Sequence, residues 1–493
     1  MEQDYVKLIF GLKLKQIRTD KELSLFGLSK LTGLSKSYLN EIEKGKKYPK
    51  PDKIILLAEH LDTPYDELVS LKLDKNLAPI GEILKSKLLK EIPLDLFGIQ
   101  EQTLIDIISN APVKVTAFIS TIIEIAKNYN FSRENFFLAS VRSYQEANAN
   151  FFEDIEDKVI KFANRNGLDL NKKISTKELE DILIEEYGYK INNEELENHK
   201  ELDNLRSIFI PKSKTLLITK HIDDAQRAFI YAKELGYNFM KLTVRPYTFT
   251  WIKFDSFDEV LNNFYASYFA GALTIPRTHF ANNIKELFNK KNIVKKDIEH
   301  LFSTYNASAE SIYQRMTNIL PKDLRLNNLF FLRFSYNKNT KSYKLNKELH
   351  LEKNLTPRAR ETNEHYCRRW ASLRALKQIA TNNTSHEFEI QVSNFVKESS
   401  KYLIFSSAIQ DPFKDYHFRS VSVGIEINKS TEKKIKSLSE EAIKAREVGV
   451  TCERCSIQNC KDRIAEPVIA NRKLKDYQTL KVVTQITEKY NKT

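Results

Sequence analysis

The 493-residue sequence is poor in glycine and proline, with 12 and 13 copies, and this scarcity favours a mainly helical chain. No run of eighteen apolar residues occurs, which excludes an ordinary membrane-spanning helix. The first residues, Met1 to Asp4, lack the pattern of a signal peptide, so we expect a cytoplasmic protein with no membrane partner. Cysteine is also scarce, and three of the four copies fall within nine residues, which favours metal or redox chemistry over a disulfide scaffold.

The length and charge of the chain limit its organisation and its partners. A chain this long should divide into roughly two to four domains, and its hydrophobic content of 41% is enough for most of it to fold. The net charge is +13, from 78 Lys and Arg against 65 Asp and Glu, which favours polyanionic partners. A solvated lysine-rich surface gives the same excess, so the charge alone leaves both interpretations open.

Hydrophobic patterning predicts further elements downstream of the first helices. Short apolar runs predict strands at residues 214–220, 329–336, 402–407 and 420–427. The charged segment 431–448 is predicted to be a helix. We therefore expect a mainly α, multidomain protein in which strands appear only in the later domains.

Two short helices near the N-terminus carry strong boundary signals. Ser24 is placed to cap a helix that ends at Gly33, and Ser35 is placed to cap a second helix, Lys36–Lys44, that stops at Gly45. Leucines and isoleucines recur at helical spacing on one face of each helix. This arrangement is the one that helix-turn-helix geometry requires.

The opposite face of the second helix presents polar side chains suited to DNA. Lys36, Ser37 and Asn40 carry donors and acceptors that match base edges in the major groove. A dense basic run follows, and its lysines would bind phosphates without reading sequence. The predicted DNA-binding residues are Ser24, Ser35, Lys36, Ser37, Asn40, Lys44, Lys46 and Lys47.

The segment GLSKSYLNEIEKGKKYPKPDKIILLAEHLDTPYDEL, which begins at Gly33, resembles the lambda-repressor-like helix-turn-helix family of the xenobiotic-response-element type. The resemblance covers about residues 5–70 and implies an all-α DNA-binding domain. One departure is Leu25, where the family often has a glutamine that contacts DNA. The alternative is an αα-hairpin used for protein contacts.

A helix predicted at residues 224–240 contains AKELGY, which resembles the AHELGH core of zinc-peptidase domains of the ImmA/IrrE type. A working zinc peptidase needs two histidines at i and i+4, with a glutamate beside the first as general base. Lys233 and Tyr237 stand at the two histidine positions, and Glu234 alone is retained.

The following helix completes the comparison with the peptidases. The stretch NFYASYFAGALTIP resembles the family's next helix and places Asn263 at the third ligand, normally a glutamate. The resemblance implies a zincin-like α+β domain that has lost its metal, with no cofactor at the degenerate positions Lys233, Glu234, Tyr237 and Asn263. The alternative is an accidental match on an ordinary amphipathic helix, and both interpretations predict no catalysis.

The cysteines form a separate candidate site. Cys452, Cys455 and Cys460 lie close in sequence, and Cys367 is the remaining cysteine that could complete a set of four thiolates around zinc. The competing interpretation is inert or redox-active thiols, and His365 is a competing ligand.

A second resemblance covers the C-terminal part of the chain. CRRW at Cys367, SVGIEI at Ser422, CERCSIQNCKDR at Cys452 and the stretch from Ala307 to Arg333 are similar to regulators of short-chain fatty acyl metabolism. Those regulators join a lambda-repressor-like domain, an often eroded peptidase-like domain and a C-terminal α+β domain with a cysteine cluster. The resemblance implies an effector of the acyl-CoA type.

These observations predict four domains. They are a helix-turn-helix domain at 1–70, a helical connector or dimerisation region at 71–150, a degenerate peptidase-like domain at 151–345 and a C-terminal sensor domain with the cysteine cluster at 346–493. An acyl-CoA needs a basic, partly apolar pocket, and the cations nearest the degenerate site are Arg227, Lys233 and Arg245.

We expect a sequence-specific DNA-binding transcription regulator that is not an enzyme. One short recognition helix reads few base pairs, so a homodimer on double-stranded DNA is expected. One alternative is a phage or mobile-element repressor controlled by protein contacts. The other is a protease that cleaves a partner repressor, and the missing zinc ligands argue against it.

Overall fold

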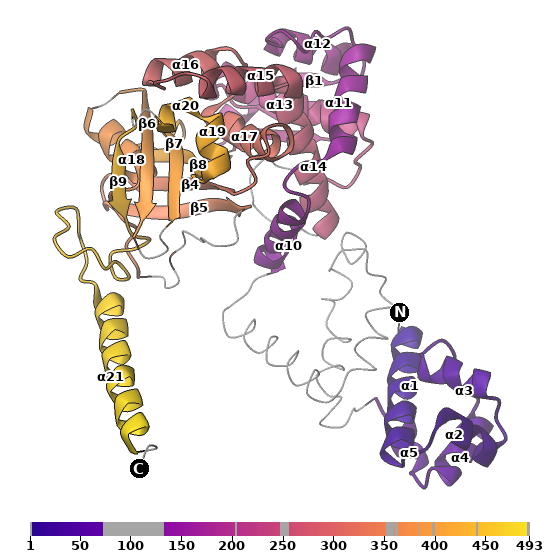
Figure 1. Cartoon of the computed structure of the whole chain (residues 1–493). Coiled ribbons are helices and arrows are strands. Elements are labelled where there is room, and N and C mark those ends of the chain that lie inside the picture. Colours follow the sequence, from indigo (N-terminus) through magenta and orange to yellow (C-terminus); the bar gives the residue numbers. More distant parts are fainter. Residues whose placement is uncertain are drawn as a thin grey trace. The chain divides into compact units, whose positions relative to one another are not determined.

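The computed structural model describes residues 2–71, 133–202, 205–246, 256–351, 359, 363–382, 384–396, 400–439 and 442–490. The chain divides into two compact units, Met1–Ser140 and Val141–Thr493, which are described separately (Figure 1). Most of the region predicted as a connector, 71–150, lies outside the described residues, apart from its last part with α10 (Arg133–Ala147).

The described part of the N-terminal unit is all helical up to residue 71. Its helices are α1 (Glu2–Asp20), α2 (Leu25–Thr32), α3 (Lys36–Glu43), α4 (Pro51–His60) and α5 (Tyr65–Val69). Their inward faces share one apolar core, in which Leu28, Leu39, Ile42 and Leu57 are fully buried. Burial of these side chains is what holds helices this short together, since isolated helices of eight residues are not stable in water.

The second unit begins with a helical layer around a small sheet. The elements are α11 (Glu153–Arg165), α12 (Thr176–Glu185), β1 (Lys190–Asn192), η2 (Glu195–Asn198), η3 (Lys200–Leu202), β2 (Ser207–Ile210), β3 (Thr215–Ile218), α13 (Asp224–Phe239) and α14 (Phe257–Thr274). The sheet has the order β1-β3-β2, with β1 parallel and β2 antiparallel to β3. Helices α13 and α14 pack closely, because Gly236 lets the ring of Phe269 approach the α13 backbone.

Three helices, α15 (Arg277–Phe288), α16 (Lys295–Ser303) and α17 (Ala309–Leu324), lead into a second sheet. The remaining elements are β4 (Leu329–Asn337), β5 (Ser342–His350), α18 (Ala371–Asn382), β6 (His386–Phe395), β7 (Ser400–Gln410), β8 (His417–Glu426), α19 (Lys429–Lys434), α20 (Lys436–Ser439), β9 (Ala445–Val448) and α21 (Val468–Tyr490). The six strands are ordered β5-β4-β8-β7-β6-β9, and only β9 is parallel to its neighbour (Figure 1).

The larger sheet is buried on both faces. Along β7, Leu403 and Phe405 belong to the core shared with α15–α17, whereas Tyr402 and Ile404 belong to the core beneath α18. This alternation follows from the two-residue period of a strand. The sheet therefore lies between two helical layers, and its residues reach both.

The mainly α, multidomain fold class predicted from the sequence is confirmed, with an all-helical N-terminal unit and strands confined to the later part. The four predicted strands are present as β3, β4, β7 and β8. The helix predicted at residues 431–448 is wrong, because this segment forms α19, α20 and β9. Within the described ranges, no helix is both long enough and apolar enough to span a membrane.

Candidate DNA interface and effector pocket

Two serine caps fix the starts of α2 and α3. Ser24 Oγ accepts a hydrogen bond from the Gly27 amide at 2.9 Å, and Ser35 Oγ accepts one from the Tyr38 amide at 3.1 Å. Gly33, at the C-terminal end of α2, has φ +66°, a left-handed conformation that favours glycine. The capped helix pair predicted from the sequence is thus present.

The polar face of α3 is open to solvent. Lys36, Ser37 and Asn40 are exposed, whereas Leu39 and Ile42 on the other face are fully buried. The buried face fixes the rotation of α3, so the exposed face is presented in a defined orientation. A recognition helix in the major groove requires such a rigid polar face.

The basic run after α3 is also exposed. Lys44, Lys46 and Lys47 all face solvent, and Lys47 lies 3.7 Å from Glu41 and 5.0 Å from the ring centroid of Tyr38. Gly45 turns the chain between these lysines with φ +66°. The eight residues predicted to bind DNA therefore belong to one continuous stretch, from the cap of α2 to the turn after α3.

An ion pair that the sequence patterns did not predict braces this stretch. Arg18 on α1 donates two hydrogen bonds to the Glu43 carboxylate at the end of α3, at 2.6 and 2.9 Å. The hydrogen bonds to Glu43 raise the pKa of Arg18 above its usual value, although burial opposes the shift. The pair links helices 25 residues apart in sequence, and no local motif indicates it.

The residues at the degenerate peptidase positions converge in the second unit. Lys233 Nζ donates to Asn263 Oδ1 at 2.6 Å, and Tyr237 Oη donates to the same oxygen at 3.3 Å. Lys233 and Tyr237 are buried. A lysine Nζ bonded to an amide oxygen therefore occupies the place where the resemblance would put two histidines and an acid.

Glu234 turns away from this group. Its carboxylate accepts hydrogen bonds from Arg245 at 2.6 Å and from Tyr189 Oη at 2.9 Å. The Arg245 guanidinium also lies 4.0 Å from the ring centroid of Phe209 and 4.3 Å from that of Tyr237. The one retained peptidase residue is thus part of a buried ion pair.

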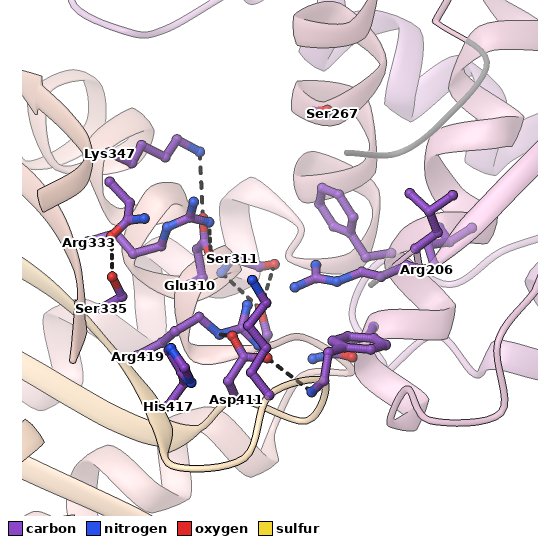
Figure 2. A pocket seen from close by; sticks show the side chains of 18 of the residues that line it. Arg206, Ser267, Glu310, Ser311, Arg333, Ser335, Lys347, Asp411, His417 and Arg419 are labelled. Atoms are coloured by element: carbon purple, nitrogen blue, oxygen red, sulfur yellow. Dashed lines mark hydrogen bonds and ion pairs between the residues drawn. The ribbon is translucent and has the colours of Figure 1, made fainter. Parts of the chain in front are cut away.

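A cavity of about 690 Å³ opens beside Lys233 and is lined by residues of α13, α14 and α17 and of strands β4, β5 and β8 of the larger sheet. Its size is typical of sites for small molecules. Figure 2 shows Arg206 and Arg419 entering it from opposite walls, with Glu310 and Ser311 between them. More cations than anions line the cavity. The cations are Arg206, Lys233, Arg333, Lys347, Lys414 and Arg419, and the anions are Glu201, Glu310 and Asp411.

The carboxylates balance only part of this positive charge. Arg333 Nη1 lies 3.3 Å from both oxygens of Glu310, and Lys347 Nζ lies 3.6 Å from one of them. Burial alone would raise the pKa of Glu310, but the charges of Arg333 and Lys347 outweigh it and lower that pKa to about 2. Glu310 is therefore ionised at neutral pH.

Two arginines of the cavity, Arg206 and Arg419, lie in a strongly basic environment. Burial, together with the charge of Arg419, lowers the pKa of Arg206 to about 10. Arg419 Nε lies 3.2 Å from Asp411, yet Nε and Nη2 are buried without a hydrogen-bond acceptor among the described residues. Buried donors in this state favour the binding of an anion with several oxygen atoms.

Of the three cations expected near an effector, only Lys233 lines this cavity. Arg227 donates to Asn193 Oδ1 at 2.7 Å, and Arg245 is held by Glu234. The arginines that line the cavity come from β4, β8 and the segment before β2, so no sequence motif groups them. The one sequence feature that could have indicated this site is the presence of arginines within otherwise apolar strands.

The four cysteines meet around one small cavity at the other end of the sheet. Cys367, Cys452 and Cys455 are buried, and Cys460 is half-buried. Burial raises the pKa of the Cys367 thiol to about 11. The segments that carry the cysteines are joined by two hydrogen bonds. Trp370 Nε1 donates to the Gly449 carbonyl at 2.7 Å, and the Cys452 amide donates to the His365 carbonyl at 2.8 Å.

The fit of a metal to these cysteines is only partial. Thiolates are ligands that zinc prefers. In the described part of the chain, however, no three His, Cys, Asp or Glu side chains are placed so that they could hold one ion. His365 is engaged elsewhere, since its Nδ1 lies 2.7 Å from Glu453. Zinc at the cysteines stays a prediction.

Comparison with known families assigns the two ends of the chain. Residues 14–68 match the helix-turn-helix family, which makes the N-terminal unit a DNA-binding domain and the chain a transcription regulator. Residues 354–483 match the C-terminal domain of short-chain fatty acyl coenzyme A regulators. The two matches together define a metabolite-responsive transcription regulator, as the resemblances in the sequence predicted.

Other comparisons add little to this assignment. A Mycobacterium tuberculosis transcriptional regulator of known structure is similar to 66% of this chain over 92% of its own length, with 15% identity and a TM-score of 0.46. No curated protein matches the chain significantly. The resemblance to zinc peptidases has no counterpart among the matched families, so the peptidase-like ancestry of the central part stays a prediction.

Proposed function

We propose that the chain regulates transcription by binding operator DNA through α3 and an acyl-CoA in the cavity beside Lys233. The observation that carries the acyl-CoA part of the proposal is the excess of cations that line that cavity, together with buried donors of Arg419 that lack acceptors among the described residues. Coenzyme A bears several phosphates, which arginines bind through paired hydrogen bonds. The match of residues 354–483 to acyl-CoA regulators supports this ligand class.

For DNA, we propose that Lys36, Ser37 and Asn40 contact base edges, while Lys44, Lys46 and Lys47 bind phosphates. The exposure of all six supports this assignment. Ser24 and Ser35 place helix N-termini where they can also bind phosphates. Because α3 spans only eight residues, two copies on two half-sites are needed for useful specificity, so we propose a homodimer.

We propose no catalytic role for the central part. Lys233, Tyr237 and Asn263 bond to one another at the positions where a peptidase holds zinc, and Glu234 is neutralised by Arg245. The side chains of lysine, asparagine and tyrosine are poor zinc ligands. We therefore expect no proteolysis, whether zinc or a chelator is added.

We also propose that the protein acts in the cytoplasm, where its DNA and coenzyme A are accessible.

Selection of genomic fragments by the purified full-length protein, with and without acetyl-CoA, propionyl-CoA or free coenzyme A, tests the proposal. We expect enrichment of fragments that share an inverted repeat, and a change in their occupancy with one of the thioesters. Arg419→Gln should remove the response to the thioester and keep DNA binding. The matched control is Arg165→Gln, at an exposed arginine on α11 outside the cavity.

Two results would contradict the proposal. Absence of any sequence preference would exclude the role of α3. Equal loss of the thioester response in Arg419→Gln and Arg165→Gln would exclude the cavity as the effector site.

A further inference from the structure

A lysine stands in the wall of the cavity where the acyl part of the proposed ligand would lie. Lys233 is 4% exposed, and its Nζ is held by Asn263 Oδ1 at 2.6 Å. It lies on α13, while Arg333 and Arg419 lie on β4 and β8. A phosphate bound by these two arginines therefore leaves the wall formed by α13 for the other end of the ligand.

Burial leaves much of the Lys233 amine neutral at physiological pH. Burial lowers the pKa of Lys233 to about 7; Glu234 opposes this effect, whereas Arg245 and Lys347 reinforce it. The carboxylate of Glu234 is itself bonded to Arg245, which limits its influence on the amine. A desolvated, neutral lysine amine is a nucleophile, unlike the exposed lysines of the chain.

We propose that Lys233 is a modification site, acylated on Nζ by the short-chain acyl thioester that occupies the cavity. This inference rests on the proposed function, because it needs the thioester to bind there. The amine lone pair attacks the thioester carbonyl carbon, and a carbon–nitrogen bond forms while the carbon–sulfur bond breaks. The sulfur leaves with the electron pair and takes up the proton released by nitrogen, so a free thiol departs and no oxidant or reductant is needed.

Asn263 acts as a positioning residue for this step. Its Oδ1 accepts a hydrogen bond from Nζ and so orients the amine, and Tyr237 bonds to the same oxygen and fixes the amide. Acylation converts an amine that can take up a proton into a neutral amide that keeps one N–H. The cavity then loses the share of positive charge that Lys233 carries when protonated, and its affinity for an anionic ligand falls.

This chemistry gives the regulator a record of the thioester that remains after the coenzyme leaves. Free coenzyme A contains no acyl group to transfer, so it occupies the same arginines without modifying Lys233. The protein would thus distinguish the thioester from the free coenzyme by a covalent change as well as by affinity.

The test is incubation of the full-length protein with propionyl-CoA, followed by intact-mass measurement and peptide mapping. We expect one propionyl group on Lys233, added on the order of 10 to 100 times faster than on the exposed Lys241 near the end of α13, because far more of the Lys233 amine is neutral. The rate at Lys233 should level off above about pH 7, while acylation of ordinary exposed amines continues to rise toward pH ~10.

Two controls separate this inference from the proposed function. Lys233→Arg has no acylable amine, so propionyl-CoA should leave residue 233 unmodified, while calorimetry of the native protein with free coenzyme A tests separately whether the cavity binds the ligand. Should that variant fail to fold, the relative rates at Lys233 and Lys241 in the native protein still decide. Binding of propionyl-CoA without preferential modification of Lys233 overturns the inference and leaves the proposed function intact; absence of binding overturns both.

Discussion

At the scale of single residues, Asn40 is the clearest candidate for reading a base. Its side chain is exposed on α3, and its amide can pair with an adenine edge through two hydrogen bonds. We predict that Asn40→Ala weakens binding to the operator by roughly 1–3 kcal/mol and leaves binding to random DNA largely unchanged. Fluorescence anisotropy on both duplexes measures the two affinities, and equal losses on them would rule out a base contact.

Lys46 should behave in the opposite way, because a phosphate contact carries no sequence information. We predict that Lys46→Ala weakens binding to operator and random DNA alike and reduces the slope of log affinity against log salt by about one. Titrations over a range of salt concentrations measure this slope. An unchanged slope would show that the exposed Lys46 side chain does not contact the phosphate backbone.

Residues of the N-terminal unit could be predicted because their roles are local. Ser24, Gly33 and Ser35 cap helices that begin or end beside them. A short stretch of sequence therefore contains both the capping residue and the helix that it caps. The pairing of Arg18 with Glu43 and the grouping of Arg206 with Arg419 arise only when distant segments meet. Sequence alone therefore predicted the candidate DNA interface and missed most of the effector cavity.

At the scale of elements, the approach of α1 to α3 depends on one glycine. A Cβ at Gly11 would lie 2.2 Å from the Ile42 carbonyl oxygen, so α1 would have to move away from α3. We predict that Gly11→Ala lowers the stability of the N-terminal unit by about 1–3 kcal/mol and weakens operator binding. Thermal unfolding and anisotropy provide the measurements.

Gly27→Ala on α2 is the matched control, since its Cβ would meet no atom closer than the Ser24 oxygen at 3.4 Å. Alanine is favoured over glycine inside a helix by up to about 1 kcal/mol, so this variant should be as stable as the native protein or more so. If both alanines act alike, the close contact at Gly11 does not determine the packing of α1.

A buried ion pair joins α11 to α17. Arg315 donates to both oxygens of Glu156, at 2.6 and 2.8 Å, and Tyr268 on α14 donates to the same carboxylate at 2.8 Å. Burial alone would raise the pKa of Glu156, but the charge and hydrogen bonds of Arg315 outweigh it and lower the pKa below its usual value. Removal of one partner leaves the other charged and buried.

We predict that Arg315→Met lowers the free energy of unfolding of the second unit by about 3–5 kcal/mol near neutral pH. Because the folded-state pKa of Glu156 is lowered, its contribution is complete above the ordinary glutamate pKa of about 4.3 and is lost as the pH falls through the folded-state value. Denaturant unfolding at several pH values measures this. A double variant, Arg315→Met with Glu156→Leu, should recover much of the stability; failure to do so would assign the loss to packing.

The elements themselves were only partly predictable. Apolar runs identified β3, β4, β7 and β8, because a buried strand requires apolar side chains in any tertiary context. The segment 431–448 has the charge pattern of a helix, but Ile435 is fully buried in an extended conformation and ends α19, and β9 then pairs with β6. Tertiary contacts outweighed local preference there, and a sequence window does not contain those contacts.

At the scale of the whole molecule, the sequence predicted a division into a DNA-binding part and a sensing part. Residues 14–68 match the helix-turn-helix family and residues 354–483 match the C-terminal domain of short-chain fatty acyl coenzyme A regulators, while the predicted domain boundaries stay a prediction. The proposed dimer was assigned to residues 71–150, most of which lie outside the described residues, so the dimer follows here only from the length of α3. How the effector changes DNA binding is therefore a question of thermodynamic coupling between the two parts.

Coupling between two binding sites is reciprocal, and this gives a prediction that needs no knowledge of the conformational change. If propionyl-CoA changes the affinity for operator DNA by a certain factor, the operator must change the affinity for propionyl-CoA by the same factor, which is typically about 5- to 150-fold. The first factor comes from DNA titrations with and without saturating thioester, and the second comes from calorimetry with and without operator.

The two factors should be compared in Lys233→Arg, because this variant excludes covalent modification. Arg419→Gln should bring both factors to one together. Unequal factors would show that the thioester also acts outside a reversible binding equilibrium, and a factor of one in each direction would mean that the cavity and the DNA-binding unit are not coupled.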